Sequence, residues 1–189
     1  MSEIHTLVLV EGESDAAAIR ALAGLFGYDL EAGTIRIHPA GGVTNFSRLL
    51  ANLARTYPHA SFRGLYDIAE ERHVRRALAS AAIPDAAHAP LESFGFFACV
   101  ADLEDELIRA LGAEAVQHVL EAQGELAAFR RFQAMPHHRH TPVDQQLRRF
   151  LGTQATRKIR CARSLAERLD PDRLPRPLMQ LAATLFDAP

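Results

Sequence analysis

Several carboxylates in this 189-residue sequence occupy positions from which an acid could bind a metal ion. Glu11 follows the apolar run Leu7–Val10 directly, and Asp67 and Asp102 end two later apolar segments in the same way. An acid that directly follows an apolar strand has no helix-capping role and is a poor strand residue, so chemistry is the better explanation for Glu11. Carboxylates without a cysteine partner are hard ligands, which favour Mg²⁺ or Mn²⁺ over zinc.

Three more acids, Asp15, Glu70 and Glu104, lie two to four residues beyond these positions. Each has an ordinary structural explanation when it is taken alone, because Asp15 or Ser14 could cap a helix and acids in a first helical turn interact favourably with the helix dipole. The whole set is more informative, since six carboxylates at one edge of a sheet repel one another unless cations neutralise them. The expected metal ligands are Glu11, Asp15, Asp67, Glu70, Asp102 and Glu104.

In the first part of the sequence, apolar segments alternate with helical patterns, and the acids lie where one gives way to the other. The apolar segments have the length of buried strands, and glycine, proline or polar residues separate them from the helical patterns. Such alternation is typical of a mostly parallel sheet with helices on both faces, where chemistry collects at the carboxyl ends of the strands. The expected strands cover residues 5–12, 34–42, 61–69 and 94–102, and the helices that follow them cover residues 14–27, 43–57, 70–82 and 103–123.

The rest of the sequence is helical and basic. Residues 1–125 carry a formal charge of −9 and residues 126–189 one of +7, which suits a protein that binds cations at one place and a polyanion at another. Two ordinary solvated surfaces could differ in the same way. We expect an α/β domain at residues 1–125 and a basic helical extension at residues 126–189. Its helices are expected at residues 125–135, 142–151, 155–169 and 176–186.

The sequence also argues against several classes of protein. It has no apolar run of 18 residues, and its N-terminus lacks the basic start and apolar centre of a signal peptide, so we expect a cytoplasmic protein with no membrane partner. Cys99 and Cys161 are then expected to be free thiols, with Cys99 in the core. Lys158 is the only lysine and lies outside any phosphate-binding glycine loop, which excludes an ATPase within this sequence.

Five stretches of the sequence resemble TOPRIM domains, and more particularly those of the OLD-family nucleases. LVLVEGESDAAAIRAL resembles the first TOPRIM motif, with Glu-Gly after an apolar strand and an Asp four residues after the Glu. GLYDIAEE resembles the second acidic motif. IHPAGGVTNFSRLLANL and VADLEDELIRALG are similar to OLD-type segments, and GTQATRKIRCARSLAERL resembles the OLD-type helix that bears an active-site lysine. The likeness covers roughly residues 5–180, and the order of the pieces is more specific than any one piece.

The resemblance implies a Rossmann-like TOPRIM fold with a mostly parallel four-stranded sheet and a C-terminal helical extension. It also implies metal-dependent hydrolysis of phosphodiester bonds in DNA, with two Mg²⁺ or Mn²⁺ ions as cofactors. OLD-type nucleases usually join the TOPRIM part to an ATPase, so either an ATPase partner acts in trans or the protein acts alone. Glu11, Asp15, Asp67 and Glu70 would hold one ion, Asp102 and Glu104 the second, and Glu11 and Lys158 would be catalytic.

Two further features affect this hypothesis. The second TOPRIM motif is usually Asp-x-Asp, whereas Ile68 and Ala69 follow Asp67 here, so that Glu70 would have to replace the missing acid. The alternatives are therefore a non-catalytic or weakly active module that binds nucleic acid or a partner ATPase, and a nucleotidyl transferase or RNA-processing nuclease. Seven arginines of the basic helices could follow a phosphate backbone or form plain helix surface. They are Arg130, Arg131, Arg148, Arg149, Arg157, Arg160 and Arg163, and we expect Arg157, Arg160 and Arg163 to bind nucleic acid.

Overall fold

A four-stranded parallel sheet forms the centre of the computed structural model, which describes residues 4–186. The strand order is β2-β1-β3-β4, and every neighbouring pair runs parallel, which confirms the expected α/β fold. The strands are β1 (Thr6–Val10), β2 (Ile35–Pro39), β3 (Ser61–Asp67) and β4 (Phe96–Cys99). The first three residues, on which the expected lack of a signal peptide partly depends, lie outside the described residues, as do residues 187–189 of the expected extension.

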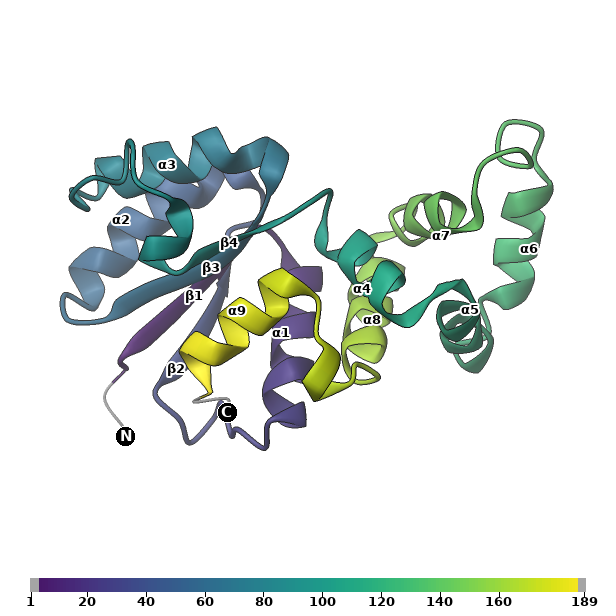
Figure 1. Cartoon of the computed structure of the whole chain (residues 1–189), viewed down its shortest axis with the longest axis horizontal. Coiled ribbons are helices and arrows are strands. Elements are labelled where there is room, and N and C mark those ends of the chain that lie inside the picture. Colours follow the sequence, from purple (N-terminus) through teal and green to yellow (C-terminus); the bar gives the residue numbers. More distant parts are fainter. Residues whose placement is uncertain (1–3, 187–189) are drawn as a thin grey trace.

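Helices cover both faces of the sheet (Figure 1). Successive side chains of a strand point to opposite faces, so β1 contributes Val8 and Val10 to one buried cluster and Leu7 and Leu9 to another. Burial on both faces explains why this segment is apolar at consecutive positions. The first face is covered by α1 (Glu13–Leu25) and α9 (Arg176–Leu185), and the second by α2 (Phe46–Thr56) and α3 (Glu71–Ser80).

Five helices form a lobe at one end of the sheet (Figure 1). Its first two helices replace the single helix expected over residues 103–123, so that prediction was wrong. Gly112 separates them with a φ of 81°, a backbone conformation that residues with a Cβ atom rarely adopt. The lobe consists of α4 (Leu103–Leu111), α5 (Ala113–Ala122), α6 (Leu126–Ala134), α7 (Val143–Leu151) and α8 (Ala155–Ala166). Short 3₁₀ helices are η1 (Val43–Asn45), η2 (Ile68–Glu70), η3 (Leu91–Phe94) and η4 (Pro171–Arg173).

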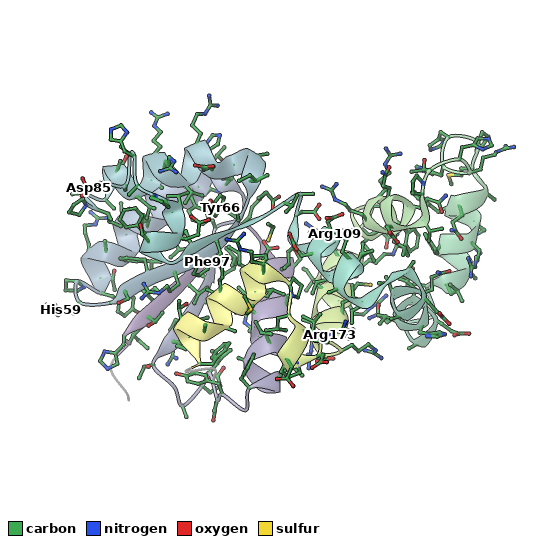
Figure 2. The ribbon with its side chains drawn as sticks, in the orientation of Figure 1. His59, Tyr66, Asp85, Phe97, Arg109 and Arg173 are labelled. Atoms are coloured by element: carbon green, nitrogen blue, oxygen red, sulfur yellow. The ribbon has the colours of Figure 1, made fainter. Side chains whose placement is uncertain are left out.

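The lobe is attached to the sheet layers at two places. Helix α4 begins shortly after β4, and α8 packs along α1. Arg109, labelled in Figure 2, lies on α4 at the junction between the sheet and the lobe. After α8 the chain returns to the sheet, where α9 packs against β4 and β3. The expected division at residue 125 stays a prediction, and α9 belongs spatially to the sheet layers.

Cys99 and Cys161 are buried free thiols, as the sequence predicts. Burial raises the pKa of both thiols, which keeps them protonated and unreactive. Over the described part of the chain, no helix combines the length and the apolar character needed to cross a membrane.

Candidate metal centre

Three strand ends and two helix starts surround a small acidic cleft of about 60 Å³. Because all four strands are parallel, the carboxyl ends of β1, β3 and β4 meet at one edge of the sheet. Five of the six expected metal ligands line the cleft together with the only lysine. The lining residues are Glu11, Gly12, Ser14, Asp15, Asp67, Asp102, Glu104 and Lys158.

Glu11 and Asp15 reach the cleft because β1 passes into α1 within a few residues. Glu11 directly follows β1, and Gly12 is the N-cap of α1. The Asp15 carboxylate accepts a 2.9 Å hydrogen bond from the Gly12 N–H, so Asp15 both caps the helix and lines the cleft. Ser14, which we considered only as a possible cap, is instead buried in the cleft lining.

Asp102 caps α4 and also contacts the helical lobe. Its Oδ1 accepts a 2.8 Å hydrogen bond from the Asp105 N–H, and its Oδ2 accepts a 2.6 Å hydrogen bond from Nε of Arg148 on α7. Sequence reasoning included Arg148 only as one of seven arginines. No spacing rule could have identified the pair, because its two members lie far apart in the chain and meet only through the packing of α4 on α7.

Glu104 and Lys158 form an ion pair between α4 and α8. Glu104 is only 2% exposed, and Nζ of Lys158 lies 3.2 Å from its Oε2. Neither oxygen of the Glu104 carboxylate accepts a hydrogen bond of ordinary geometry from the residues that the structure describes. A buried carboxylate with a single cationic partner is costly, and its oxygens can still accept a metal cation.

Burial and mutual repulsion shift the titration of the cluster. Burial raises the pKa of Asp67 to about 7, and the nearby charges of Glu11 and Asp102 add to the effect. Burial raises the pKa of Glu104 to about 7 although the Lys158 ammonium opposes it, and burial also raises the pKa of Asp15. Burial disfavours the charge on Lys158, but Glu104 and other acids outweigh this effect and raise the pKa of its ammonium.

The carboxylate oxygens that line the cleft are suitable ligands for a hard divalent cation. Glu104 has Lys158 as its one cationic partner, and burial together with the charges of neighbouring acids raises the pKa of Asp67, so both carboxylates would be stabilised by a further cation. Within residues 4–186, no three Asp, Glu, His or Cys side chains are already grouped closely enough to hold an ion. A bound cation would therefore draw the carboxylates together, and Asp102 would have to share its oxygens with Arg148.

The structure does not bring Glu70 into the cleft. It ends the 3₁₀ helix η2 and is the N-cap of α3, and its Oε2 lies 3.7 Å from Nε2 of His73. Glu70 is absent from the lining residues and from the charges that raise the pKa of Asp67. The turn after Asp67 thus does not place Glu70 as a substitute for the missing second acid.

The structure places Arg157, which we expected to bind nucleic acid, inside the lobe and not on an exposed surface. Its guanidinium is buried, donates hydrogen bonds to Glu125 Oε2 at 3.0 and 3.2 Å, and lies 4.0 Å from the centre of the Phe150 ring. These contacts make Arg157 part of the core of the lobe. Arg160 and Arg163 are exposed but also have acidic partners, at 2.8 Å from Glu125 and Glu167 respectively.

Solved structures of OLD proteins share the fold of this chain. The C-terminal region of the Xanthomonas campestris pv. campestris OLD protein is 20% identical, with a TM-score of 0.66, and the match covers 99% of this chain and 97% of that one. The C-terminal region of the Burkholderia pseudomallei OLD protein is 21% identical with a TM-score of 0.67, and the match covers 96% and 97% of the two chains. No curated protein sequence matches the chain.

The parallel sheet with the acidic cleft at its edge shares the fold of these OLD C-terminal regions over nearly the whole chain. Residues 5–57 match the profile of the family described as "Overcoming lysogenization defect protein-like, TOPRIM domain". The profile match over residues 5–57 and the shared fold confirm the resemblance to OLD-like TOPRIM domains that was inferred from the motifs.

Proposed function

We propose that this protein is a metal-dependent phosphodiester hydrolase that cleaves DNA. The observation that carries the proposal is the meeting of Lys158 with acids from three strand ends in one cleft. Clustered carboxylates bind the divalent cations that phosphoryl transfer requires, and a cation opposite them can contact the phosphate. The OLD-like TOPRIM domain supports a nucleic-acid substrate.

Glu11, Asp15 and Asp67 would hold one Mg²⁺ or Mn²⁺ ion, and Asp102 and Glu104 would hold a second. When bound, such ions lower the pKa of a water molecule and stabilise the leaving oxygen. The first three residues lie on β1, α1 and β3, and the last two lie at the start of α4, so rigid elements hold both groups.

Lys158 would stabilise negative charge on the reacting phosphate. Its ammonium remains protonated because the surrounding acids raise its pKa, and its side chain is 38% exposed despite the ion pair with Glu104. A compact ammonium of this kind acts as a point charge, which an arginine does not reproduce. A cation held by Glu104 would replace this ion pair and leave the Lys158 ammonium free to contact the phosphate.

The test is cleavage of supercoiled plasmid by the purified chain with Mg²⁺ or Mn²⁺. Glu11→Gln and Lys158→Ala should each reduce the rate by at least about 100-fold. The matched control is Glu13→Gln, because Glu13 lies on the solvent-exposed side of the same motif and pairs only loosely with Arg20 at 3.8 Å. Cleavage that is equal in Glu11→Gln and wild type would refute the proposal and point to a contaminating nuclease.

A second candidate is a TOPRIM module that binds nucleic acid or an ATPase partner without cleaving DNA. The position of Glu70 outside the cleft favours it, because the site then has one acid fewer than the usual Asp-x-Asp motif would supply. Titration with Mn²⁺ separates the two candidates. A catalytic site should bind the ion with an affinity that falls in Asp67→Asn, whereas a relic should bind weakly and equally in both proteins. A preference for RNA over plasmid DNA would instead indicate the RNA-processing alternative.

A further inference from the structure

Beside the acidic cleft lies a wider groove of about 520 Å³ that contains Arg148 and Arg149 of α7. Asp102 lines both spaces, so the groove opens next to the carboxylates of the cleft. The proposed function does not use the two arginines. The groove is large enough for a phosphate and the sugar attached to it, whereas the cleft alone is not.

The charges in the groove favour an anion. Its two acids are already paired, because Asp105 lies 2.8 Å from Nε of Arg109 and Asp102 lies 2.6 Å from Nε of Arg148. Arg149 is exposed and forms no ion pair with any residue in the described range 4–186. Arg149 is therefore the one charged side chain of the groove lining without an ion-pair partner among residues 4–186, and it lies beside the carboxylates of the cleft.

The guanidinium of Arg148 is held in place by Asp102 and still has N–H groups available to bind a ligand. Only its Nε donates a hydrogen bond, to Asp102, among the contacts within residues 4–186, and its side chain remains 41% exposed. The two terminal nitrogens are left for another acceptor, and a guanidinium held in place by a carboxylate presents its remaining N–H groups in a defined plane. This geometry suits a phosphate, which accepts paired hydrogen bonds from arginine.

We propose that Arg148 and Arg149 bind backbone phosphates of DNA next to the bond that enters the acidic cleft, and that Asp102 positions Arg148 for this contact. The inference rests on the proposed function and specifies where its substrate lies. It moves the DNA-binding surface from Arg157 on α8 to α7, because Arg157 is buried while the α7 pair faces the groove. Asp102 would thereby connect substrate binding with the metal centre.

The test is the affinity of the full chain for a short fluorescein-labelled DNA duplex, measured by anisotropy at several salt concentrations with Ca²⁺ and again with EDTA. Arg149→Ala should weaken binding about 3- to 10-fold and lower the salt slope by about one, because one phosphate contact and its counterion release are lost. Arg148→Ala should weaken binding at least as much. Arg131→Ala is the matched control, since Arg131 is an exposed arginine on α6 of the same lobe and should change neither value.

The outcomes separate this inference from the proposed function. Three results would overturn the inference. Arg149→Ala could bind the duplex as strongly as wild type, Arg131→Ala could lose as much affinity as Arg149→Ala, or the wild-type chain could fail to bind the duplex. Arg149→Ala makes this test independent of folding, because the side chain forms no hydrogen bond or ion pair within residues 4–186, whereas Arg148→Ala also removes the bond to Asp102. If wild type binds through the α7 arginines yet never cleaves plasmid, the inference holds and the nuclease proposal fails.

Discussion

Nζ of Lys158 lies 3.2 Å from Oε2 of Glu104, and this ion pair connects α8 with α4 at the acidic cleft. The only lysine of the chain is thus paired with the most deeply buried acid of the cluster. The Lys158 ammonium and the Arg148 guanidinium cannot neutralise five carboxylates, so the cation-free protein retains excess negative charge at this edge of the sheet. The stability and activity of the protein should therefore depend on pH and on divalent cations.

The cation-free protein should lose stability as the pH rises from about 4 to about 7. Asp67 and Glu104 have ordinary pKa values of 3.8 and 4.5, and in the folded protein each rises to about 7. The folded state therefore holds these protons more tightly, which stabilises it fully below the ordinary values and no longer above pH 7. We expect the free energy of unfolding to fall by on the order of 1–3 kcal/mol across this range. Urea unfolding in EDTA at several pH values measures this change in the free energy of unfolding. Asp67→Asn should make the free energy of unfolding depend less on pH. The same pH dependence in Asp67→Asn and wild type would contradict the assigned charge cluster.

Divalent cations should restore that stability at alkaline pH. Because the ligands must be deprotonated, Mg²⁺ or Mn²⁺ should raise the melting temperature more at about pH 8 than at about pH 6. At a hundredfold excess over the dissociation constant the gain is about 2.7 kcal/mol. Differential scanning fluorimetry with and without the ions checks this, with Asp67→Asn as the variant that should respond less. An equal response of both proteins would place the bound ion elsewhere.

Glu70→Gln should leave cleavage within about twofold of wild type, whereas Asp67→Asn should reduce it by at least about 100-fold. The difference follows from position, because Asp67 lines the cleft while the Glu70 carboxylate lies beside His73. Plasmid cleavage rates at saturating Mg²⁺ provide the comparison. A large loss in Glu70→Gln would mean that Glu70 moves into the cleft when the ion binds and replaces the missing acid of the second motif.

Local patterns were sufficient to predict the sheet and most of the acidic cluster. Glu11, Asp67 and Asp102 follow apolar segments, and parallel strands bring such positions to one edge whatever the details of packing. The contacts made by α8 were not predictable in this way. Lys158 and Arg157 are adjacent in a basic sequence, yet one faces the cleft and the other enters the core of the lobe, because neighbouring positions on a helix point in different directions.

The break between α4 and α5 shows a second limit of sequence patterns. Residues on both sides of Gly112 continue a helical pattern, and a glycine inside such a pattern is tolerated at a cost of about 1 kcal/mol. The structure instead places Gly112 at a φ of 81° and uses it to end one helix and begin the next. Helix α5 then packs against α6 and α8, and the local sequence does not specify these contacts.

Arg157→Ala should destabilise the protein by about 2–4 kcal/mol, whereas Arg163→Ala should cost no more than about 0.5 kcal/mol. The buried guanidinium of Arg157 bonds to Glu125, Phe150 O and Thr153, so its removal breaks all three contacts and leaves Oε2 of Glu125 without a donor, although Arg160 still bonds to Oε1. Arg163 has a side chain that is 70% exposed, and its one ion-pair partner within residues 4–186 is Glu167, the C-cap of its own helix. Urea unfolding compares the two variants, and DNA affinity under folding conditions distinguishes a structural role from direct binding. If the Arg157→Ala protein had normal stability but bound DNA poorly, Arg157 would have to be assigned a direct role in DNA binding.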